Sequence, residues 1–326
     1  MKKSWKVVFW LLALALIGYT LSIVPLDDVG DTLGSLKPIQ IALLVLLNAA
    51  IISLFALRWW VLLRTQGYRV PFRAAIRYRL AAFGVSYFTP GPQFGGEPLQ
   101  VYFLHHNHAI PTTDAVASLS LDKLLELLSN FTFLAFGVIM ITSRGLLNFA
   151  ENIFLSVVVL ALATLPWLYL MGLTQNIKPF SKLARGSARK FPKSVRFATA
   201  VQHSETQMSD FCRRHPVKIM GLMLLSGVVW AALVFEYWLM LYFLGTQLNL
   251  WHTLVFITAA RLAFLAPLPG GLGSLEISQV LAAQTLGLST SLGVSIGLLI
   301  RLRDISFGLL GLLWGGIRMG MPIRHS

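Results

Sequence analysis

Predominantly apolar stretches alternate with short polar ones along the whole chain. Six of the apolar stretches reach the length of about 20 residues that a helix needs to cross the hydrocarbon core of a bilayer. The segments between them are charged or rich in turn-forming residues. The pattern therefore predicts an all-α polytopic membrane protein with about six transmembrane helices. The six predicted spans are residues 5–24, 38–63, 115–142, 153–173, 217–244 and 291–317.

Two further apolar stretches, residues 76–104 and 251–286, are interrupted near their middle by Pro and Gly. The interruptions are near copies of each other. Each has a Pro-x-Pro, then a Gly-Gly, then a Glu followed three residues later by a Gln, and each comes after an Arg-Leu-Ala. Pro breaks a helix, and broken helices at corresponding places in two halves of a membrane protein indicate a transport site.

Positive charge is concentrated in alternate loops. Lys and Arg cluster before residue 7, between residues 64 and 77, between residues 178 and 214, and after residue 317. Cytoplasmic loops carry the excess of Lys and Arg, so we expect both termini to be cytoplasmic. This bias stays consistent only if each interrupted stretch enters and leaves the membrane from the same side. The sequence therefore predicts two re-entrant helical hairpins, the first entering from the cytoplasm and the second from outside.

This topology predicts a single domain over residues 1–326, built as an inverted repeat. The first repeat unit covers about 38–142 and the second about 217–317, and residues 153–173 form the connecting helix that inverts the second unit. Residues 174–216 interleave basic residues with Phe, Leu and Val. That segment is either a pair of basic amphipathic helices on the inner leaflet or a solvated cytoplasmic linker.

Composition supports a membrane protein and argues against several other classes of protein. Charged residues make up only 12% of the chain, hydrophobic residues 56%, and mean hydropathy is +0.70. The net charge of +14 is explained by the positive-inside bias and by anionic lipids, so nucleic acid is not an expected partner. The lone Cys212 allows no internal disulfide. The chain shows no nucleotide-binding loop, and neither a metal nor a cofactor is expected.

The two Gly-Gly turns are the first part of a predicted substrate-binding and translocation site. Glu97 and Glu276 follow the turns, where a helix start offers unpaired N–H groups and a positive dipole end. Each carboxylate either caps its own helix or pairs with a neighbouring Arg, or it binds a ligand or proton directly. The glycines that we place in this site are Gly95, Gly96, Gly270, Gly271 and Gly273.

Charged residues within the apolar helices form the second part of the predicted site. A charge at the bilayer centre costs at least about 2.5–3.5 kcal/mol, so these side chains are expected to face a cavity or an opposite charge. Guanidinium groups suit phosphate and carboxylate alike. An alternative for the 122–126 cluster is a buried charge network that fixes helix register. The residues are Arg79, Asp122, Lys123, Glu126, Arg261, Arg301, Arg303 and Asp304.

These motifs resemble those of a known family. The stretch from Gly95 to Tyr102, the following Leu121-Asp122-Lys123, and Pro267 to Gly273 with Glu276 are similar to the lysylphosphatidylglycerol synthase transmembrane family, also described as flippase-like. In fused members this region translocates aminoacylated phosphatidylglycerol, and a separate soluble domain carries the aminoacyl transferase. The resemblance covers nearly the whole chain and implies translocation without synthesis.

We therefore expect a non-enzymatic lipid translocase in the inner, cytoplasmic membrane. Its partners would be membrane lipids: an anionic or aminoacylated phospholipid, or a lipid-linked glycan. A separate transferase and further copies of the chain are additional candidate partners. Two alternatives stay open: a membrane-embedded lipid or glycosyl transferase, and a non-catalytic partner of a separate glycosyltransferase.

Overall fold

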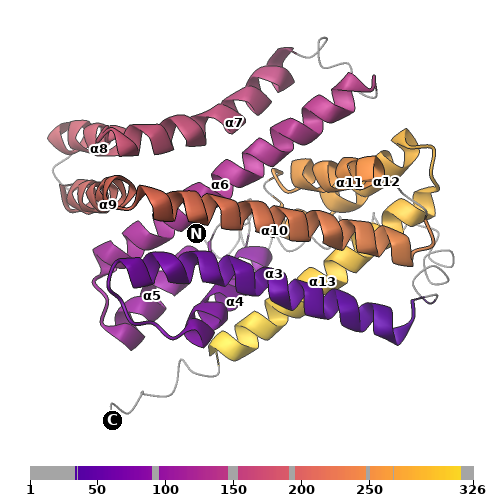
Figure 1. The fold of residues 1–326 in the computed structure, drawn as a ribbon, viewed down its shortest axis with the longest axis horizontal. Coiled ribbons are helices and arrows are strands. Elements are labelled where there is room, and N and C mark those ends of the chain that lie inside the picture. Colours follow the sequence, from indigo (N-terminus) through magenta and orange to yellow (C-terminus); the bar gives the residue numbers. More distant parts are fainter. Residues whose placement is uncertain are drawn as a thin grey trace.

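A computed structural model describes residues 34, 36–89, 95–145, 153–190, 195–246, 250–266 and 268–316. The predicted span 5–24 and the first Pro-x-Pro lie outside these residues. The described part is built from eleven α-helices and one short 3-10 turn (Figure 1). They are α3 (Pro38–Thr65), α4 (Phe72–Phe88), α5 (Glu97–His108), α6 (Thr112–Ser143), α7 (Ile153–Thr174), α8 (Pro179–Lys190), α9 (Val195–Arg214), α10 (Pro216–Phe243), α11 (Leu250–Ala263), η3 (Pro269–Gly271), α12 (Ser274–Thr285) and α13 (Thr290–Gly316).

Four of the described helices are long and apolar enough to cross a membrane: α3, α6, α10 and the Val157–Thr174 part of α7. Each coincides with a predicted span. The 27-residue α13 coincides with the predicted span 291–317 but carries Arg301, Arg303 and Asp304. The polytopic helical class is therefore confirmed, whereas six complete spans stay a prediction.

Both interrupted stretches are broken in the structure where Pro and Gly predicted it. Helix α4 ends at Phe88 and α5 begins at Glu97, while α11 ends at Ala263 and α12 begins at Ser274. The same order of helices thus occurs twice, as long, medium, short, long. The lengths are 28, 17, 12 and 32 residues in α3–α6, and 28, 14, 12 and 27 residues in α10–α13.

The first helices of the two units, α3 and α10, run antiparallel and exchange equivalent contacts (Figure 1). Asn48 of α3 donates to Glu236 of α10 at 2.8 Å, and Arg58 of α3 donates to Ser226 of α10 at 3.2 Å. In each helix the two residues lie ten positions apart. Each contact therefore joins the earlier position of one helix to the later position of the other, which is the relation expected of an inverted repeat.

Each broken helix packs on the last helix of the opposite unit. Helix α4 lies against α13 with backbones in close approach, since a Cβ on Gly311 would collide with the carbonyl of Leu80. Helix α11 lies against α6, where a Cβ on Gly137 would collide with Thr258. Small residues allow this proximity between membrane helices. The two units are interlocked rather than placed side by side.

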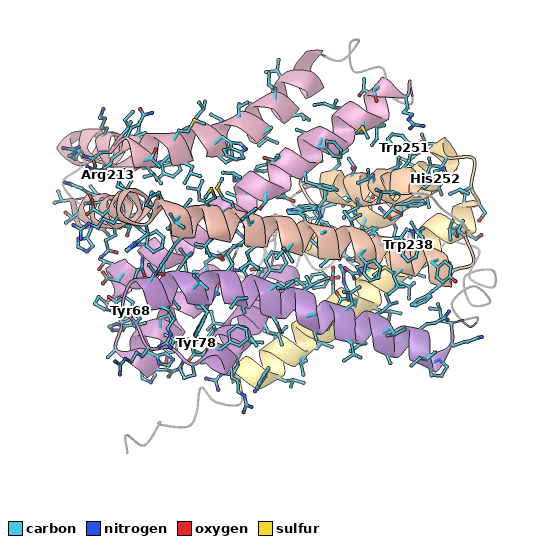
Figure 2. All side chains as sticks on the ribbon, viewed as in Figure 1. Tyr68, Tyr78, Arg213, Trp238, Trp251 and His252 are labelled. Carbon is cyan, nitrogen blue, oxygen red and sulfur yellow. The ribbon has the colours of Figure 1, made fainter. Side chains whose placement is uncertain are left out.

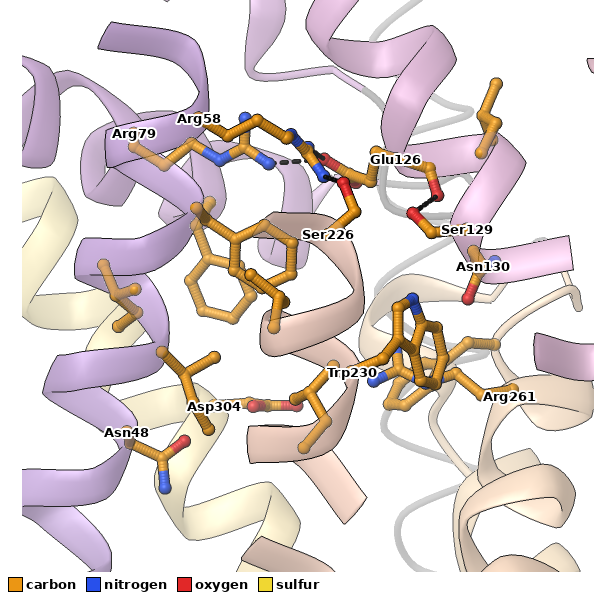
Figure 3. Close-up of a pocket in the computed structure, with 18 of the residues that line it drawn as sticks. Asn48, Arg58, Arg79, Glu126, Ser129, Asn130, Ser226, Trp230, Arg261 and Asp304 are labelled. Carbon is orange, nitrogen blue, oxygen red and sulfur yellow. Dashed lines mark hydrogen bonds and ion pairs between the residues drawn. The ribbon is translucent and has the colours of Figure 1, made fainter. Parts of the chain in front are cut away.

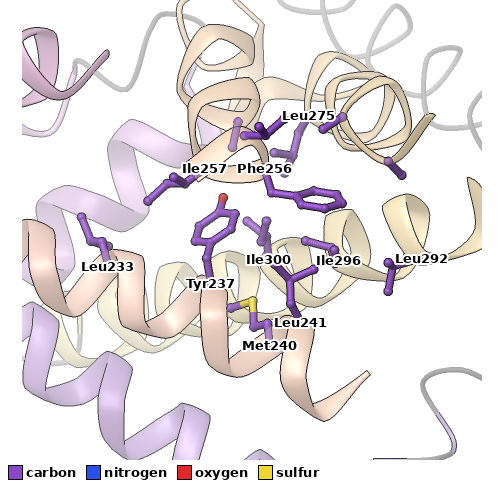
Figure 4. Packing of buried hydrophobic residues seen from close by; sticks show 14 of the residues in the cluster. Leu233, Tyr237, Met240, Leu241, Phe256, Ile257, Leu275, Leu292, Ile296 and Ile300 are labelled. Atoms are coloured by element: carbon purple, nitrogen blue, oxygen red, sulfur yellow. The ribbon is translucent and has the colours of Figure 1, made fainter. Parts of the chain in front are cut away.

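Apolar side chains lie both inside and outside the bundle. The largest buried cluster joins α10 to α13 around Tyr237, Phe256, Ile257 and Ile300 (Figure 4). Large aliphatic side chains also face outward, as at Leu46 on α3 and Leu224 on α10, which are 66% and 69% exposed. An apolar exterior of this extent is stable only against lipid or a partner.

The two ends of the bundle carry aromatic and polar side chains (Figure 2). Tyr68, Tyr78 and Arg213 lie at one end, and Trp238 and Trp251 lie toward the other. Tyr68, which precedes α4, donates to Asp114, which begins α6. The chain therefore enters the α4–α5 pair and leaves it at the same end of the bundle.

The segment 174–216 forms two helices, α8 and α9, which pack against each other. Glu205 of α9 accepts hydrogen bonds from the backbone N–H groups of Phe180 and Ser181, at 3.2 and 2.6 Å, and so occupies the N-terminus of α8. Cys212 of α9 is buried in an apolar cluster that includes Leu121 and Leu173, and burial raises the pKa of its thiol from 9.0 to about 12.

Candidate functional site

The first unit holds a cluster of charges between α3, α4 and α6. Asp122 of α6 is paired with Arg58 of α3 at 2.7 Å and with Arg79 of α4 at 2.5 Å. Glu126, one turn further along α6, is paired with the same two arginines. Arg58 and Asp122 are each only 1% exposed. Because a buried charge is tolerated only when it is paired, these bonds hold the three helices together.

The first hairpin is attached to this cluster through Lys123. Its ammonium lies 2.9 Å from Glu126 and 3.4 Å from Glu97, the first residue of α5. The second carboxylate oxygen of Glu97 accepts the N–H of Gly95 at 2.9 Å, and the N–H of Gly96 is donated to Ser86. Glu97 is therefore paired with a cation, but this cation is Lys123 and not an arginine.

Glu276 is engaged in the same way in the second unit. One of its oxygens accepts the N–H of Gly273 at 2.9 Å, and the other lies 2.5 Å from Arg301 of α13. Arg301 also donates to the carbonyl oxygen of Gly270 at 2.6 Å and to the hydroxyl of Tyr87 on α4 at 3.1 Å. Gly270 has φ +51°, and a Cβ there would meet the Tyr87 ring. This arginine thus fastens the second hairpin tip to both units.

A third set of charges joins α3, α10 and α13. Glu236 of α10, which is fully buried, lies 2.5 Å from Arg303 of α13 and accepts from Asn48 of α3. Arg303 also lies 2.8 Å from its neighbour Asp304. In each unit, an ion pair thus joins the first helix to the last, but the helix that carries the positive charge differs between the units. The first helix supplies the base in unit one and the acid in unit two.

Arg261 of α11 is arranged differently from the other arginines. Its guanidinium carbon lies 4.8 Å from the ring centroid of Trp230, which in turn stacks on Phe133 at 4.1 Å. Within the described residues no carboxylate lies within 4.0 Å of it, and its buried Nε has no hydrogen-bond partner. The guanidinium therefore lies over an aromatic ring and forms no ion pair within 4.0 Å among the described residues.

Some of these charged groups line a cavity of about 350 Å³ between the two units (Figure 3). Arg58, Arg79 and Glu126 lie on one side of it, and Trp230 with Arg261 lie on another. Apolar side chains such as Phe55 and Leu233 complete the wall. Helices α3, α4, α6, α10, α11 and α13 all contribute lining residues. A smaller cavity of about 80 Å³ lies beside it, lined by Glu97, Asp122 and Tyr87 among others.

The structure therefore divides the predicted site residues into groups. Six line the larger cavity: Arg79, Lys123, Glu126, Arg261, Arg303 and Asp304. Glu97 and Asp122 line the smaller one. The remaining residues, at the two hairpin tips and on α13, hold the hairpins in place instead of facing the larger cavity: Gly95, Gly96, Gly270, Gly271, Gly273, Glu276 and Arg301.

Sequence reasoning missed Arg58, which anchors the first charge cluster. The available signal was its isolation: it is the lone charged residue in a long apolar run, and a charge at membrane depth usually has a partner or a role. The partners of Glu236, namely Arg303 and Asn48, could not be chosen from the sequence because several bases lie on neighbouring helices.

Comparisons with known proteins show the family to which the chain belongs. Residues 5–311 match the family model described as the lysylphosphatidylglycerol synthase TM region. The chain is 25% identical to a UPF0104 membrane protein of Methanothermobacter thermautotrophicus, over 86% of this chain and 85% of that one. It is 24% identical to a UPF0104 membrane protein of Pyrococcus horikoshii, over 84% and 85% of the two chains. With nearly the whole chain matched, this protein belongs to the lysylphosphatidylglycerol synthase transmembrane-region family.

Proposed function

We propose that this protein moves a membrane lipid between the two leaflets of the bilayer, with the headgroup passing through the cavity between the units. The observation that carries the proposal is the cavity itself. It lies among helices long and apolar enough to span a membrane, yet charged groups line it. Moving a polar headgroup past hydrocarbon requires groups that replace its hydration, and such groups stand in this wall.

The proposal includes a topology. Both termini lie in the cytoplasm, α4–α5 is a hairpin entering from the cytoplasm, and α11–α12 is a hairpin entering from outside the inner, cytoplasmic membrane. The contact of Tyr68 with Asp114 supports the first hairpin, because it brings the beginning of α4 and the beginning of α6 together. The antiparallel contacts between α3 and α10 support the inversion of the second unit.

The roles of the charged residues follow from their contacts. Arg79, Lys123, Glu126, Arg303 and Asp304 form the polar wall along which the headgroup moves. Glu97 and Glu276 act on the path indirectly, since each holds a hairpin tip. Under this proposal the chain needs no catalytic residue, and its substrate is a phospholipid, aminoacylated or anionic, or a lipid-linked glycan.

Reconstitution tests the proposal. Purified protein is placed in vesicles whose two leaflets contain a headgroup-labelled fluorescent phospholipid, and a reductant that cannot cross the membrane quenches the outer leaflet. Transfer by the wild type exposes the inner label to quenching as well. Asn130→Trp fills the cavity from α6 and should slow the transfer at least tenfold.

Ile139→Trp is the matched control, because Ile139 also lies on α6 but is 65% exposed on the outer surface. It should leave transfer at the wild-type rate. Equal transfer by Asn130→Trp and the wild type would exclude the cavity as the path. Absence of transfer by the wild type itself, together with incorporation of a labelled donor into lipid, would favour the transferase alternative.

A further inference from the structure

The cationic side chains of the larger cavity are unequally neutralised. Five of them line it: Arg58, Arg79, Lys123, Arg261 and Arg303. Four lie within 4.0 Å of at least one carboxylate. Arg261 has no such partner in the part of the chain that the structure describes, and its Nε, although buried, donates to no acceptor there. A guanidinium has five N–H donors, and leaving them unsatisfied in a buried place is costly.

The repeat shows what is missing around Arg261. Its counterpart in the first unit is Arg79, since both begin the Arg-Leu-Ala that precedes a broken turn. Arg79 is held by Asp122 and Glu126 from the last helix of its unit. Asp122 lies 25 residues after Glu97, and the residue 25 positions after Glu276 is Arg301. The position that supplies an acid in unit one thus supplies a base in unit two.

The carboxylates of the second unit that flank the cavity form their ion pairs with other arginines, although one oxygen of Glu236 makes no hydrogen bond in the described part of the chain. Glu236 and Asp304 both pair with Arg303, and Glu276 pairs with Arg301. Arg261 instead lies over the Trp230 ring and lines the cavity, and its buried Nε–H has no acceptor within the described ranges. A planar fork held in this way is suited to a tetrahedral or carboxylate anion that binds through two oxygens.

We infer that Arg261 is the phosphate-binding subsite of the cavity, and that its ligand is the phosphodiester of a phospholipid headgroup. The inference rests on the proposed function and deepens it by naming the group that Arg261 recognises. The phosphate takes the place that Asp122 and Glu126 take at Arg79. The apolar wall near it, including Phe264 and Leu233, favours a ligand that carries acyl chains over a water-soluble phosphate.

Binding to the purified full-length chain in detergent tests the inference. The probes are dioleoyl phosphatidylglycerol, dioleoylglycerol, which has the same chains without phosphate, and glycerol 3-phosphate, which has the phosphate without chains. Binding is measured by native mass spectrometry and by the lipid-induced rise in Tm. The wild type should bind the first probe at least tenfold more tightly than either of the others.

Arg261→Gln should reduce phosphatidylglycerol binding by about tenfold or more, since it removes the charge-assisted hydrogen bonds to the phosphate. Arg261→Lys, which keeps the charge but not the fork, should give an intermediate affinity. Trp230→Leu, which removes the aromatic support, should also weaken binding.

Arg64→Gln and Arg144→Gln are the matched controls. Each of these arginines stacks on a tryptophan, at 5.1 Å from Trp60 and 4.9 Å from Trp251, but both are exposed and neither lines the cavity. Both variants should bind as the wild type does.

Unchanged binding by folded Arg261→Gln, or equal binding of dioleoylglycerol, would overturn the subsite. If glycerol 3-phosphate binds as tightly as the lipid, the phosphate that Arg261 recognises need not belong to a lipid, and that part of the inference would be wrong. These outcomes are separable from failure of the proposed function. If only the subsite inference is wrong, the wild type still transfers lipid in vesicles. If only the proposed transfer is wrong, the wild type still shows phosphate-dependent binding in detergent.

Discussion

At the scale of single residues, two arginines share one pair of carboxylates. Arg58 and Arg79 come from different helices, and Asp122 and Glu126 bind both. Removal of either arginine leaves a negative charge buried without full compensation, which is far more costly than never having buried the pair. Each member of this cluster is therefore important for stability whatever its role in transport.

Arg58→Ala should destabilise the protein by about 3–5 kcal/mol, the cost of breaking a buried ion pair. Unfolding in mixed micelles measures the change in free energy. Arg64→Ala on the same helix, where the side chain is exposed, should change stability by less than about 0.5 kcal/mol. Equal effects of the two substitutions would show that the Arg58 pairs contribute nothing.

Cys212 should be chemically inert in the folded protein. Only the thiolate reacts, and burial raises the thiol pKa to about 12, so the reactive fraction is negligible at pH 8 and grows only as the pH approaches that value. A maleimide should not label the native protein at pH 8 and should label it fully in denaturing detergent. Rapid labelling of the native protein would contradict the buried position.

At the scale of elements, the sequence predicted where the helices lie in the chain better than it predicted which helices pack against each other. Hydrophobic runs located α3, α6, α7 and α10, and Pro and Gly located both breaks, because these signals are local. Which helices pack together depends on contacts far apart in the chain. Nothing in the sequence pattern showed that α4 would lie on α13 and α11 on α6.

The α4–α13 contact gives a prediction of its own. Gly311→Ala should destabilise the protein, since the added Cβ collides with the backbone at Leu80, and overpacking costs about 1–3 kcal/mol. Gly221→Ala on α10 adds a Cβ into open space and should be neutral or slightly stabilising, because Ala favours helix over Gly. Thermal unfolding of both variants checks this. A stable Gly311→Ala protein would mean that the two helices are further apart than described.

At the scale of the whole molecule, the candidate site could be predicted in part. Six predicted residues do line one cavity, because charges in apolar helices rarely face lipid. Their individual roles could not be predicted. Arg261 and Arg301 look alike in the sequence, since each is an arginine in an apolar helix of the second unit. Only the three-dimensional arrangement shows that Arg301 pairs with a carboxylate and that Arg261 lies over an aromatic ring.

The proposed topology predicts a labelling pattern for single cysteines at exposed positions. Arg69→Cys and Thr112→Cys, which flank the first hairpin, should both react with an impermeant maleimide from the cytoplasmic side only. Leu250→Cys and Thr290→Cys, which flank the second, should both react from outside only. The inert Cys212 need not be removed. Labelling of Arg69→Cys and Thr112→Cys from opposite sides would mean that α4 and α5 cross the membrane completely.

The paired contacts between α3 and α10 restrict how the two units can move. Asn48–Glu236 and Arg58–Ser226 lie ten residues apart on each helix, which is about 15 Å of helix length. Sliding one helix along the other by a single turn, about 5.4 Å, would break both bonds at once. A small tilt of one helix against the other, about an axis midway between the two bonds, moves each bonded pair much less and leaves both bonds in place. Under the proposed lipid transfer, we therefore predict that the two units rock about the α3–α10 contact and do not slide along it.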